Sequence, residues 1–165
     1  MYTGTGKGKT TAALGLALRA AGSGKRVYIA QFCKGAFCSE HVALARFRDL
    51  ITCVRYGSGA FVTDTLTDQD TYRARRGWNE VKRVVSSGKY QLVILDEANV
   101  AMHLGLLSVD AVCALIDDRP VDLELVLTGR NAPAPIIARA DLVTDMVSVK
   151  HYYDCGSGAR RGIEL

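Results

Sequence analysis

The first residues of the chain form a glycine-rich stretch whose residue types and spacing could bind phosphate. An apolar helical pattern over residues 12–21 follows this stretch, which reads Gly4-Thr5-Gly6-Lys7-Gly8-Lys9-Thr10-Thr11. Glycines let the backbone curl so that successive N–H groups point inward, and these amides bind phosphate together with the N-terminus of the following helix. In the usual phosphate loop, Lys9 would contact the phosphates and the Thr10 hydroxyl would bind magnesium. We therefore predict a nucleotide-binding loop.

The start of this loop departs from the usual pattern. In G-x-x-x-x-G-K-[ST], Gly8, Lys9 and Thr10 fit the last three positions. The leading glycine would stand at Thr3, whereas the nearest glycine, Gly4, lies one residue later. This difference favours a variant of the loop over an ordinary kinase or GTPase. The alternative is a glycine-rich turn that merely precedes a helix, and a second motif argues against it.

That second motif is a short apolar run that ends in two carboxylates, Tyr90-Gln91-Leu92-Val93-Ile94-Leu95-Asp96-Glu97. The run is too apolar for an edge strand and too short for a helix, so we predict a strand buried on both faces. Asp96 and Glu97 would then lie beside Thr10. A carboxylate near a hydroxyl and a triphosphate is the usual way in which magnesium is held. The alternative is that the acidic pair only starts the next helix.

Length and composition set the broad class of the protein. A chain of 165 residues, 48% of them hydrophobic, fits one domain over residues 1–165 with a substantial core. The net charge of +4 is mild, so it favours an anionic ligand without requiring nucleic acid. We find neither a run of eighteen apolar residues nor a charged-then-apolar leader. We therefore expect a cytoplasmic protein that does not contact membranes.

The cysteines are odd in number and scattered, which suits reduced thiols better than a disulfide framework. They are Cys33, Cys38, Cys53, Cys113 and Cys155. Cys33, Cys38 and His41 are close enough in sequence to suggest a metal site. Their spacing is irregular and no fourth ligand stands nearby, so we expect buried or idle thiols instead.

Strand and helix patterns alternate along the chain. We predict strands at residues 1–3, 26–32, 51–56, 90–97, 123–127 and 142–147. We predict helices at residues 9–21, 39–48, 68–85 and 108–117, and a short helix after Pro133. This alternation indicates a three-layer α/β fold, P-loop NTPase-like (RecA-like), with a mostly parallel sheet and helices on both faces.

Sheets of this kind bind ligands beyond the carboxyl ends of their strands. The rule predicts that five loops share one rim of the molecule. These are residues 3–10, 33–38, 57–64, 96–99 and 128–133.

An ordered succession of motifs resembles the family of P-loop corrinoid adenosyltransferases, which share the displaced first glycine. The likeness covers essentially the whole chain, and Cys33 stands where the family usually has an aliphatic residue. The motifs are residues 2–15, Gln31-Phe32-Cys33-Lys34-Gly35, Leu95-Asp96-Glu97, Leu104-Gly105-Leu106-Leu107, Arg119-Pro120, Leu127-Thr128-Gly129-Arg130, Ala132-Pro133, residues 140–144 with Met146, Val149-Lys150-His151 and residues 159–164.

The resemblance implies transfer of the 5′-deoxyadenosyl group of ATP to the cobalt of a reduced corrinoid, with release of triphosphate. A Co(I) centre attacks the ribose C5′ in line, so no serine, cysteine or general base is required. The protein must align the reactants and stabilise charge on the leaving group. Family members bind ATP reversed relative to other P-loop enzymes, which turns C5′ toward the second substrate.

The resemblance also implies roles for residues at the nucleotide. The loop from Gly4 to Thr11 would bind the triphosphate, with Lys7 and Lys9 countering its charge. Thr10 and Glu97 would hold Mg²⁺, with Asp96 as a further partner of the ion. The residues expected to carry catalysis are therefore Lys9, Thr10 and Glu97. Arg130 would add positive charge at the rim, and the alternative is a surface arginine that caps its loop.

The corrinoid side follows from the same resemblance. An aromatic residue after the third strand displaces the lower axial ligand in the family, and Phe61 is the candidate here. Thr63 stands where enterobacterial members have a second aromatic residue, and Phe61 could equally be core. Lys34, Gly35 and Glu40 match loop positions of the family, without assigned contacts. The family also implies an electron donor such as a reduced flavoprotein, and a homodimer.

Two other functions stay open at this point. One is an ATPase or kinase that uses the loop in the usual orientation and needs no corrinoid. The other is a RecA-like nucleic-acid-binding module, which would need a basic, aromatic face. Arg73, Arg75 and Arg76 form the dense basic cluster of the sequence, and such a cluster on a helix is more often a solvated face.

Overall fold

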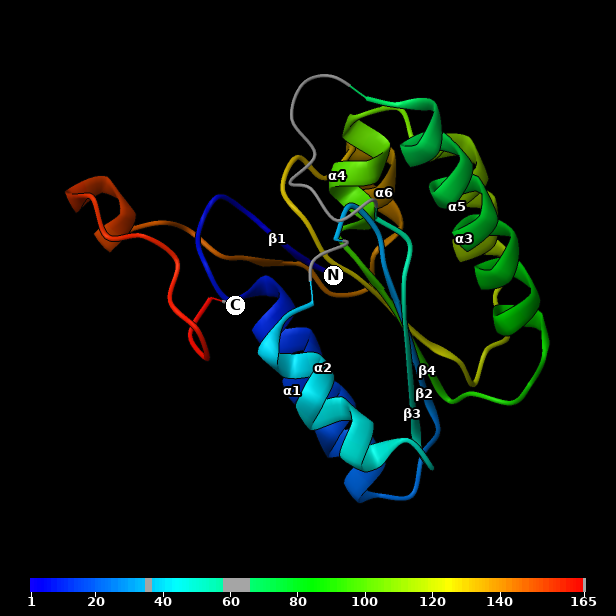
Figure 1. Cartoon of the computed structure of the whole chain (residues 1–165). Coiled ribbons are helices and arrows are strands. Elements are labelled where there is room, and N and C mark those ends of the chain that lie inside the picture. The colour runs from blue at the N-terminus through cyan, green and yellow to red at the C-terminus, as the bar shows by residue number, and fades with distance from the viewer. Residues whose placement is uncertain (35–36, 58–65, 165) are drawn as a thin grey trace.

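A computed structural model describes residues 1–34, 37–57 and 66–164 (Figure 1). Its strands are β1 (Tyr2–Thr3), β2 (Val27–Gln31), β3 (Ile51–Arg55), β4 (Leu92–Asp96), β5 (Glu124–Leu127) and β6 (Thr144–Asp145). Its α-helices are α1 (Lys9–Gly22), α2 (Ser39–Leu44), α3 (Asp68–Ser86), α4 (Ala98–His103), α5 (Val109–Asp117) and α6 (Ala134–Arg139). Two short 3₁₀ helices are η1 (Ala45–Phe47) and η2 (Tyr152–Cys155).

The strands form a parallel sheet in the order β3-β2-β4-β5. Strands β1 and β6 form a second parallel pair, and one bridge between Tyr2 and Thr128 joins β1 to the residue after β5. Strand β1, which leads into the glycine loop, is therefore separated from the acidic strand β4 by β5. In the register of β2 with β4, Gln31 stands opposite Asp96, so these two polar residues meet at the carboxyl end of the sheet.

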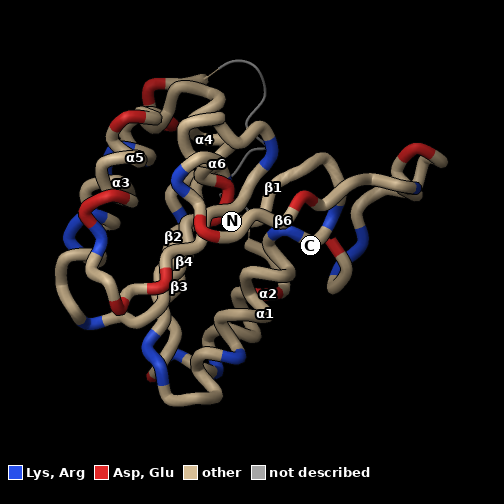
Figure 2. The backbone as a smooth tube through the Cα atoms, turned by 180° about the vertical axis from the view of Figure 1, so that it is seen from behind, with Lys and Arg blue, Asp and Glu red and all other residues tan. Residues whose placement is uncertain are grey.

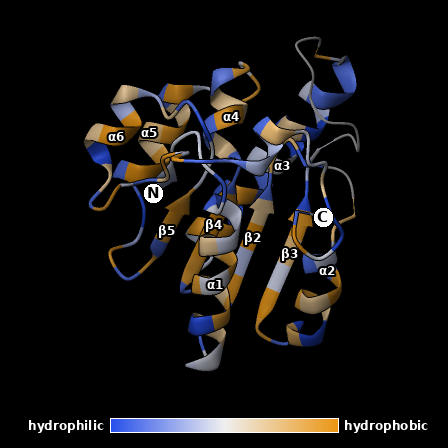
Figure 3. Ribbon diagram, turned by 90° about the vertical axis from the view of Figure 1, so that its left-hand side faces the viewer, coloured by the Kyte–Doolittle hydropathy of each residue, from blue (hydrophilic) through white to orange (hydrophobic). Residues whose placement is uncertain are grey.

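Helices cover both faces of the sheet, as the alternation of strands and helices predicts. Along β2, successive side chains point to opposite faces. Val27 and Ile29 pack in one cluster with the small residues of α1, whereas Tyr28 and Ala30 pack in another with α3 and α5. Figure 1 shows α1 and α2 on one side of the strands and α3 and α5 on the other, and Figure 3 shows α1 in front of the sheet. The predicted mostly parallel α/β architecture is confirmed.

Several predicted elements have the expected type and different ends. All five residues of β4 are buried, as predicted, but the strand covers less than the predicted 90–97. The predicted helix 39–48 is the shorter α2 followed by the tighter turn η1. The predicted strand 142–147 is reduced to the two residues of β6. Thr67 caps α3 and Ser108 caps α5 through side-chain oxygens that accept backbone N–H groups, which explains why those helix starts were readable.

Helix α4 is not among the predicted helices, because residues 96–99 are predicted as a loop and a helix that starts at the acidic pair is only the alternative. Glu97 has a left-handed backbone with φ of 58°, and this single residue turns the chain from β4 directly into α4. A residue in this conformation ends a strand without any glycine or proline signal. The acidic pair therefore both ends the strand and precedes a helix.

Acidic and basic positions are interspersed over the described surface, and α3 carries residues of both signs (Figure 2). Arg75 and Arg76 are exposed on α3, whereas Arg73 donates a hydrogen bond to the Gly57 carbonyl. This arrangement fits a solvated helix face better than a nucleic-acid surface. Within the described ranges, none of the helices combines the length and the apolar character needed to cross a bilayer.

Candidate nucleotide site and active site

A cavity of about 790 Å³ lies where the glycine loop meets the carboxyl ends of the strands. The loop contributes residues 6–11, and four predicted residues from other segments also line the cavity: Lys34, Glu40, Glu97 and Arg130. The structure thus gathers most of the predicted site. Asp96 lies beneath the cavity wall, because its side chain is almost fully buried. Phe61 and Gly35 lie outside the described residues.

The glycines of the loop are needed because the segment after β6 packs against them. Gly4 has φ of 100°, and a Cβ atom there would lie 2.1 Å from an Asp145 carboxylate oxygen. A Cβ atom on Gly6 would lie 2.6 Å from the Met146 carbonyl oxygen, which also accepts the Gly6 N–H. Thr3 still belongs to β1 and pairs with Asp145. The displaced first glycine therefore coincides with the end of the strand, where the left-handed conformation begins.

Lys9 is the first residue of α1 and is buried behind the loop. Its Nζ donates hydrogen bonds to the carbonyl oxygens of Gly4 and Gly6, at 2.8 and 2.5 Å. Burial lowers the pKa of Lys9, nearby Arg130 lowers it further, and Glu97 and Asp145 oppose the shift. The ammonium is thus held by backbone carbonyls that phosphate oxygens could replace.

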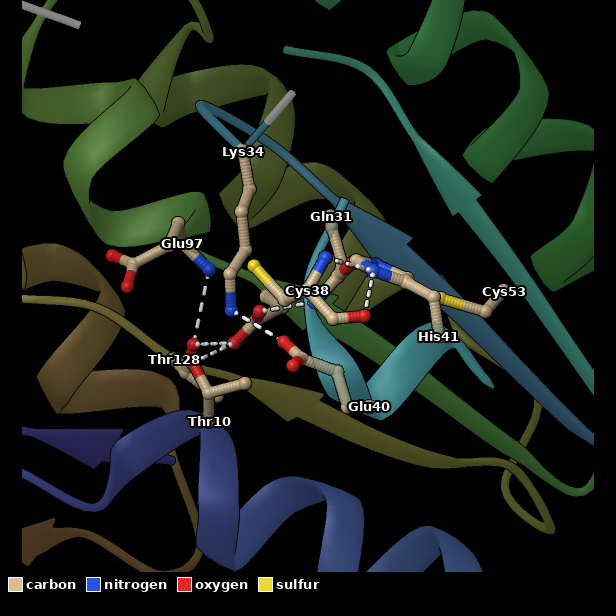
Figure 4. A network of polar contacts seen from close by, with 10 residues as sticks. Thr10, Gln31, Lys34, Cys38, Glu40, His41, Cys53, Glu97 and Thr128 are labelled. Carbon is tan, nitrogen blue, oxygen red and sulfur yellow. Dashed lines mark hydrogen bonds and ion pairs between the residues drawn. The ribbon is translucent and has the colours of Figure 1, made fainter. Parts of the chain in front are cut away.

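Asp96 is the centre of a buried hydrogen-bond cluster under the loop, and Figure 4 labels its partners Thr10, Thr128 and Gln31. Its Oδ1 accepts the hydroxyls of Thr10 at 2.9 Å and of Thr128 at 2.7 Å. Its Oδ2 accepts Nε2 of Gln31 at 3.0 Å. Such bonds to a charged acceptor are among the stronger hydrogen bonds in proteins. The predicted neighbours Thr10 and Asp96 are therefore in direct contact.

Glu97 lies next to this cluster and lines the cavity. Its backbone N–H donates to the Thr128 hydroxyl at 3.0 Å, which holds the left-handed turn. Burial raises the pKa of Glu97 and the Asp96 carboxylate raises it further, while Lys9, Lys34 and Arg130 oppose the shift. Carboxylate and hydroxyl oxygens are the ligands that magnesium prefers. The Thr10 hydroxyl and the Glu97 carboxylate both line the cavity and fit such an ion. A bound cation would also stabilise the charged form of Glu97, which burial and Asp96 disfavour.

Glu40, in the first turn of α2, forms an ion pair at 2.9 Å with Lys34, which lies in the segment after β2. Both side chains line the cavity. The sequence suggests Cys33, Cys38 and His41 as a metal site but favours buried or idle thiols instead. In the structure, donor atoms of Cys38, Glu40 and His41 lie within 4.8 Å of one another, and Cys33 is not among them. Glu40 is bound to Lys34, and both ring nitrogens of His41 have hydrogen-bond partners. Coordination by this group would have to break those contacts.

None of the five cysteines, all of which are described, forms a disulfide, as expected for reduced thiols. Burial raises the pKa of Cys33 to about 12 and that of Cys53 to about 11. These two thiols are therefore protonated at neutral pH and are poor nucleophiles.

Sequence reasoning missed the part that the C-terminal segment plays at this site. Nζ of Lys7 donates to the Tyr152 hydroxyl at 2.8 Å and to a Glu164 carboxylate oxygen at 2.7 Å. Arg160 also binds Glu164, and its guanidinium lies 4.7 Å from the Tyr152 ring centroid. Hydrogen bonds from Arg160, Lys7 and Tyr152 hold the pKa of Glu164 well below its usual range. The sequence motif over residues 159–164 could have pointed to this segment, but nothing in the motif indicates that Glu164 contacts Lys7.

A glycine loop before α1, with a threonine hydroxyl bound to the acidic end of a buried parallel strand, is the arrangement of a nucleotide-binding α/β protein with a phosphate loop. Comparison with known proteins gives the particular family. The chain belongs to the family described as ATP:corrinoid adenosyltransferase BtuR/CobO/CobP, whose sequence model matches residues 1–165. The resemblance inferred from the motifs is confirmed.

Individual relatives agree with this assignment. A corrinoid adenosyltransferase of Pseudomonas aeruginosa is 37% identical over 167 residues, covering 100% of this chain and 82% of that protein. A corrinoid adenosyltransferase of Escherichia coli K12 is 34% identical, over 99% of this chain and 83% of that protein. An uncharacterized protein of Nostoc sp. is 39% identical over 92% of this chain, which spans only 44% of its length. Family and relatives together indicate ATP:corrinoid adenosyltransferase activity.

Proposed function

We propose that this chain transfers the 5′-deoxyadenosyl group of ATP to the cobalt of a reduced corrinoid and releases triphosphate. The Co(I) centre supplies the electron pair for the new Co–C5′ bond, and the C5′–O bond breaks with its electron pair leaving on the triphosphate. The observation that carries the proposal is the cavity where the glycine loop, Glu97 and Arg130 meet the Lys34–Glu40 pair. One side of the cavity suits a polyanion, and the other offers hydrogen-bonding groups for a second substrate.

The residues of the loop would bind and orient the triphosphate. Lys9 would exchange the carbonyls of Gly4 and Gly6 for phosphate oxygens, which keeps its charge compensated throughout. Lys7 would exchange Glu164 for the polyanion in the same way. Thr10 and Glu97 would hold Mg²⁺, which when bound would neutralise charge on the departing triphosphate. Preorganised positive charge of this kind is a large contribution to catalysis.

The corrinoid side rests on fewer described residues. Lys34 and Glu40 could donate to and accept from the amide arms of the macrocycle. Phe61 as a wedge at the lower face of the cobalt and Gly35 as a contact stay predictions from the sequence. The same holds for the RecA-like detail of the fold, the single domain over residues 1–165, the homodimer, the reduced flavoprotein donor and the cytoplasmic location.

The experiment mixes the protein with ATP, magnesium and chemically reduced cobalamin. We expect the light-sensitive spectrum of adenosylated cobalamin to appear, together with intact triphosphate in equal amount. Formation of ADP or free phosphate while the cobalt compound stays unchanged would favour an ATPase or kinase instead. Arg75→Ala, on the exposed face of α3, provides a control variant that should keep wild-type activity.

A further inference from the structure

A continuous series of hydrogen bonds runs from the N-terminus of α2 to the glycine loop (Figure 4). The Cys38 N–H donates to Nδ1 of His41 at 2.9 Å. Nε2 of His41 lies 2.7 Å from Oε1 of Gln31, and Nε2 of Gln31 donates to Oδ2 of Asp96 at 3.0 Å. The other oxygen of Asp96 accepts the Thr10 hydroxyl. Five residues from four segments are thereby joined, Cys38 through its backbone N–H and the other four through their side chains.

The direction of every bond in this series follows from Asp96. An ionised carboxylate only accepts hydrogen bonds, so Gln31 must present its NH₂ group to Asp96 and its oxygen to His41. His41 must then carry its proton on Nε2, which leaves Nδ1 free to accept the Cys38 N–H. The neutral Nε2–H tautomer is thus the form that satisfies all the contacts. The Cys53 thiol, 3.8 Å from the same Gln31 oxygen, is also a donor and agrees with this orientation.

The surroundings of His41 favour that neutral form. Burial lowers the pKa of His41, and the positive charges of Arg55 and Lys34 lower it further. Glu40 and the carbonyl of Cys38 act in the opposite direction. The tautomer required by the hydrogen bonds therefore agrees with the charges around the ring.

Burying the Gln31 amide destabilises the fold unless the amide forms hydrogen bonds. Its side chain is fully buried at the end of β2, where the register sets it opposite Asp96. A buried amide that lost either partner would leave a polar group without a hydrogen bond, whereas an apolar residue there would need no partner. The amide instead fixes the plane of the Asp96 carboxylate, so that Oδ1 faces Thr10 and Thr128.

We propose that Gln31 and His41 are positioning residues for adenosyl transfer, which hold the Asp96 carboxylate and through it the Thr10 hydroxyl in place, and which link both to the N-terminus of α2. Helix α2 contributes Ser39, Glu40 and Ala43 to the cavity. A second substrate that moves the beginning of α2 would therefore change the orientation of the group that holds the magnesium ligand. This inference rests on the proposed function.

The first test observes the His41 tautomer directly by ¹H–¹⁵N nuclear magnetic resonance of the imidazole rings. The chain has three histidines, so His41→Gln assigns the signal by removing it. We expect a neutral Nε2–H ring in the wild-type protein. In Asp96→Asn, the Thr128 hydroxyl already accepts the Glu97 N–H and keeps donating to the oxygen of the new amide, so the new NH₂ group faces Gln31. Gln31 must then turn its own oxygen toward that NH₂ group and its NH₂ toward His41. The proton of His41 should then move to Nδ1, where the Cys38 carbonyl oxygen lies 3.1 Å away.

An unchanged tautomer in Asp96→Asn would overturn the proposal, because it would mean that the orientation of Asp96 does not reach His41. Should that variant fail to fold, Gln31→Met serves instead, because it removes the acceptor of the Nε2 proton while the Cys38 N–H still donates to Nδ1. We expect the Nε2–H resonance of His41 to shift and its proton to exchange faster with solvent. An Nε2–H signal unchanged in both respects would refute the contact between Gln31 and His41. Gln91→Met is the matched control, since it removes one hydrogen bond, to the Arg26 N–H, at the other end of the sheet.

The second test measures the affinity for ATP by calorimetry with and without magnesium. Gln31→Met should weaken binding of Mg-ATP by about tenfold, the usual size of the loss when a residue supporting a metal ligand is removed. Binding of ATP without magnesium should change less. Gln91→Met should match the wild-type protein in both measurements.

Two substitutions of His41 separate positioning from packing. In His41→Gln the amide nitrogen can occupy the place of Nε2 and still donate to Gln31. In His41→Asn the shorter amide can accept the Cys38 N–H but cannot reach Gln31. We expect His41→Asn to bind Mg-ATP more weakly than the wild-type protein and His41→Gln to bind it about as tightly as the wild type. Equal losses in the two variants would overturn the proposal. Because tautomer and Mg-ATP binding are measured without corrinoid, these results are independent of whether adenosyl transfer is observed.

Discussion

Replacement of Thr128 by valine tests whether the buried cluster under the glycine loop stabilises the protein. The Thr128 side chain is fully buried, and valine has nearly its shape without the hydroxyl. That hydroxyl donates to Asp96 at 2.7 Å and accepts the Glu97 N–H at 3.0 Å. Thr128→Val removes both bonds at once and leaves a backbone N–H without its acceptor in a left-handed turn.

The expected size of the effect follows from these two bonds. A hydrogen bond to a charged group contributes at least about 1.5 kcal/mol, and an unsatisfied buried N–H costs at least about 1 kcal/mol. The free energy of unfolding should therefore fall by at least about 2.5 kcal/mol. For a domain of this length, 1 kcal/mol corresponds to roughly 2–4 °C, so the melting temperature should fall by at least about 5 °C.

Thr128→Ser is the matched control, because it keeps the hydroxyl and loses one methyl group. That loss costs about 1 kcal/mol. Urea and thermal unfolding of the three proteins should rank the wild type first, Thr128→Ser second and Thr128→Val clearly last. If Thr128→Val were as stable as Thr128→Ser, the two hydrogen bonds would not stabilise the turn and the reasoning would be wrong.

Four further substitutions test the site. Lys9→Ala should lower turnover at least about a hundredfold through loss of charge at the leaving group, and near-normal turnover would refute that role. Glu97→Gln should raise the magnesium requirement. Burial raises the pKa of Glu97 in the folded protein, so the ionised carboxylate destabilises the magnesium-free fold above about pH 4.5. Glu97→Gln removes that charge and should therefore raise the free energy of unfolding above this pH and leave it unchanged below. A stability difference that does not depend on pH would contradict this. Glu164→Gln should tighten ATP binding by weakening the contact with Lys7, as calorimetry would show, whereas unchanged affinity would exclude competition. Phe61→Ala should slow adenosylation from Co(II) more than from pre-reduced Co(I), and equal losses would make Phe61 ordinary packing.

Local patterns in the sequence were sufficient for the parts of the protein that depend on neighbouring residues. Glycine spacing revealed the loop, because only glycine accepts the backbone conformation of Gly4 and the close approach of Met146 at Gly6. The apolar run before Asp96 revealed a buried strand, because a strand covered on both faces has no polar alternation. The order of strands and helices then placed the loop and the acidic pair at one edge of the sheet.

Tertiary structure alone decided which distant residues complete the site. Gln31 and Asp96 are 65 positions apart in the chain, and Lys7 and Glu164 are 157 apart. No local periodicity relates such pairs, because their contact depends on strand register and on where the C-terminal segment crosses the loop. The sequence shows that Gln31 is a polar residue at the end of an otherwise mostly apolar strand. Its partner, its orientation and the tautomer it imposes on His41 follow only once β2 and β4 lie side by side.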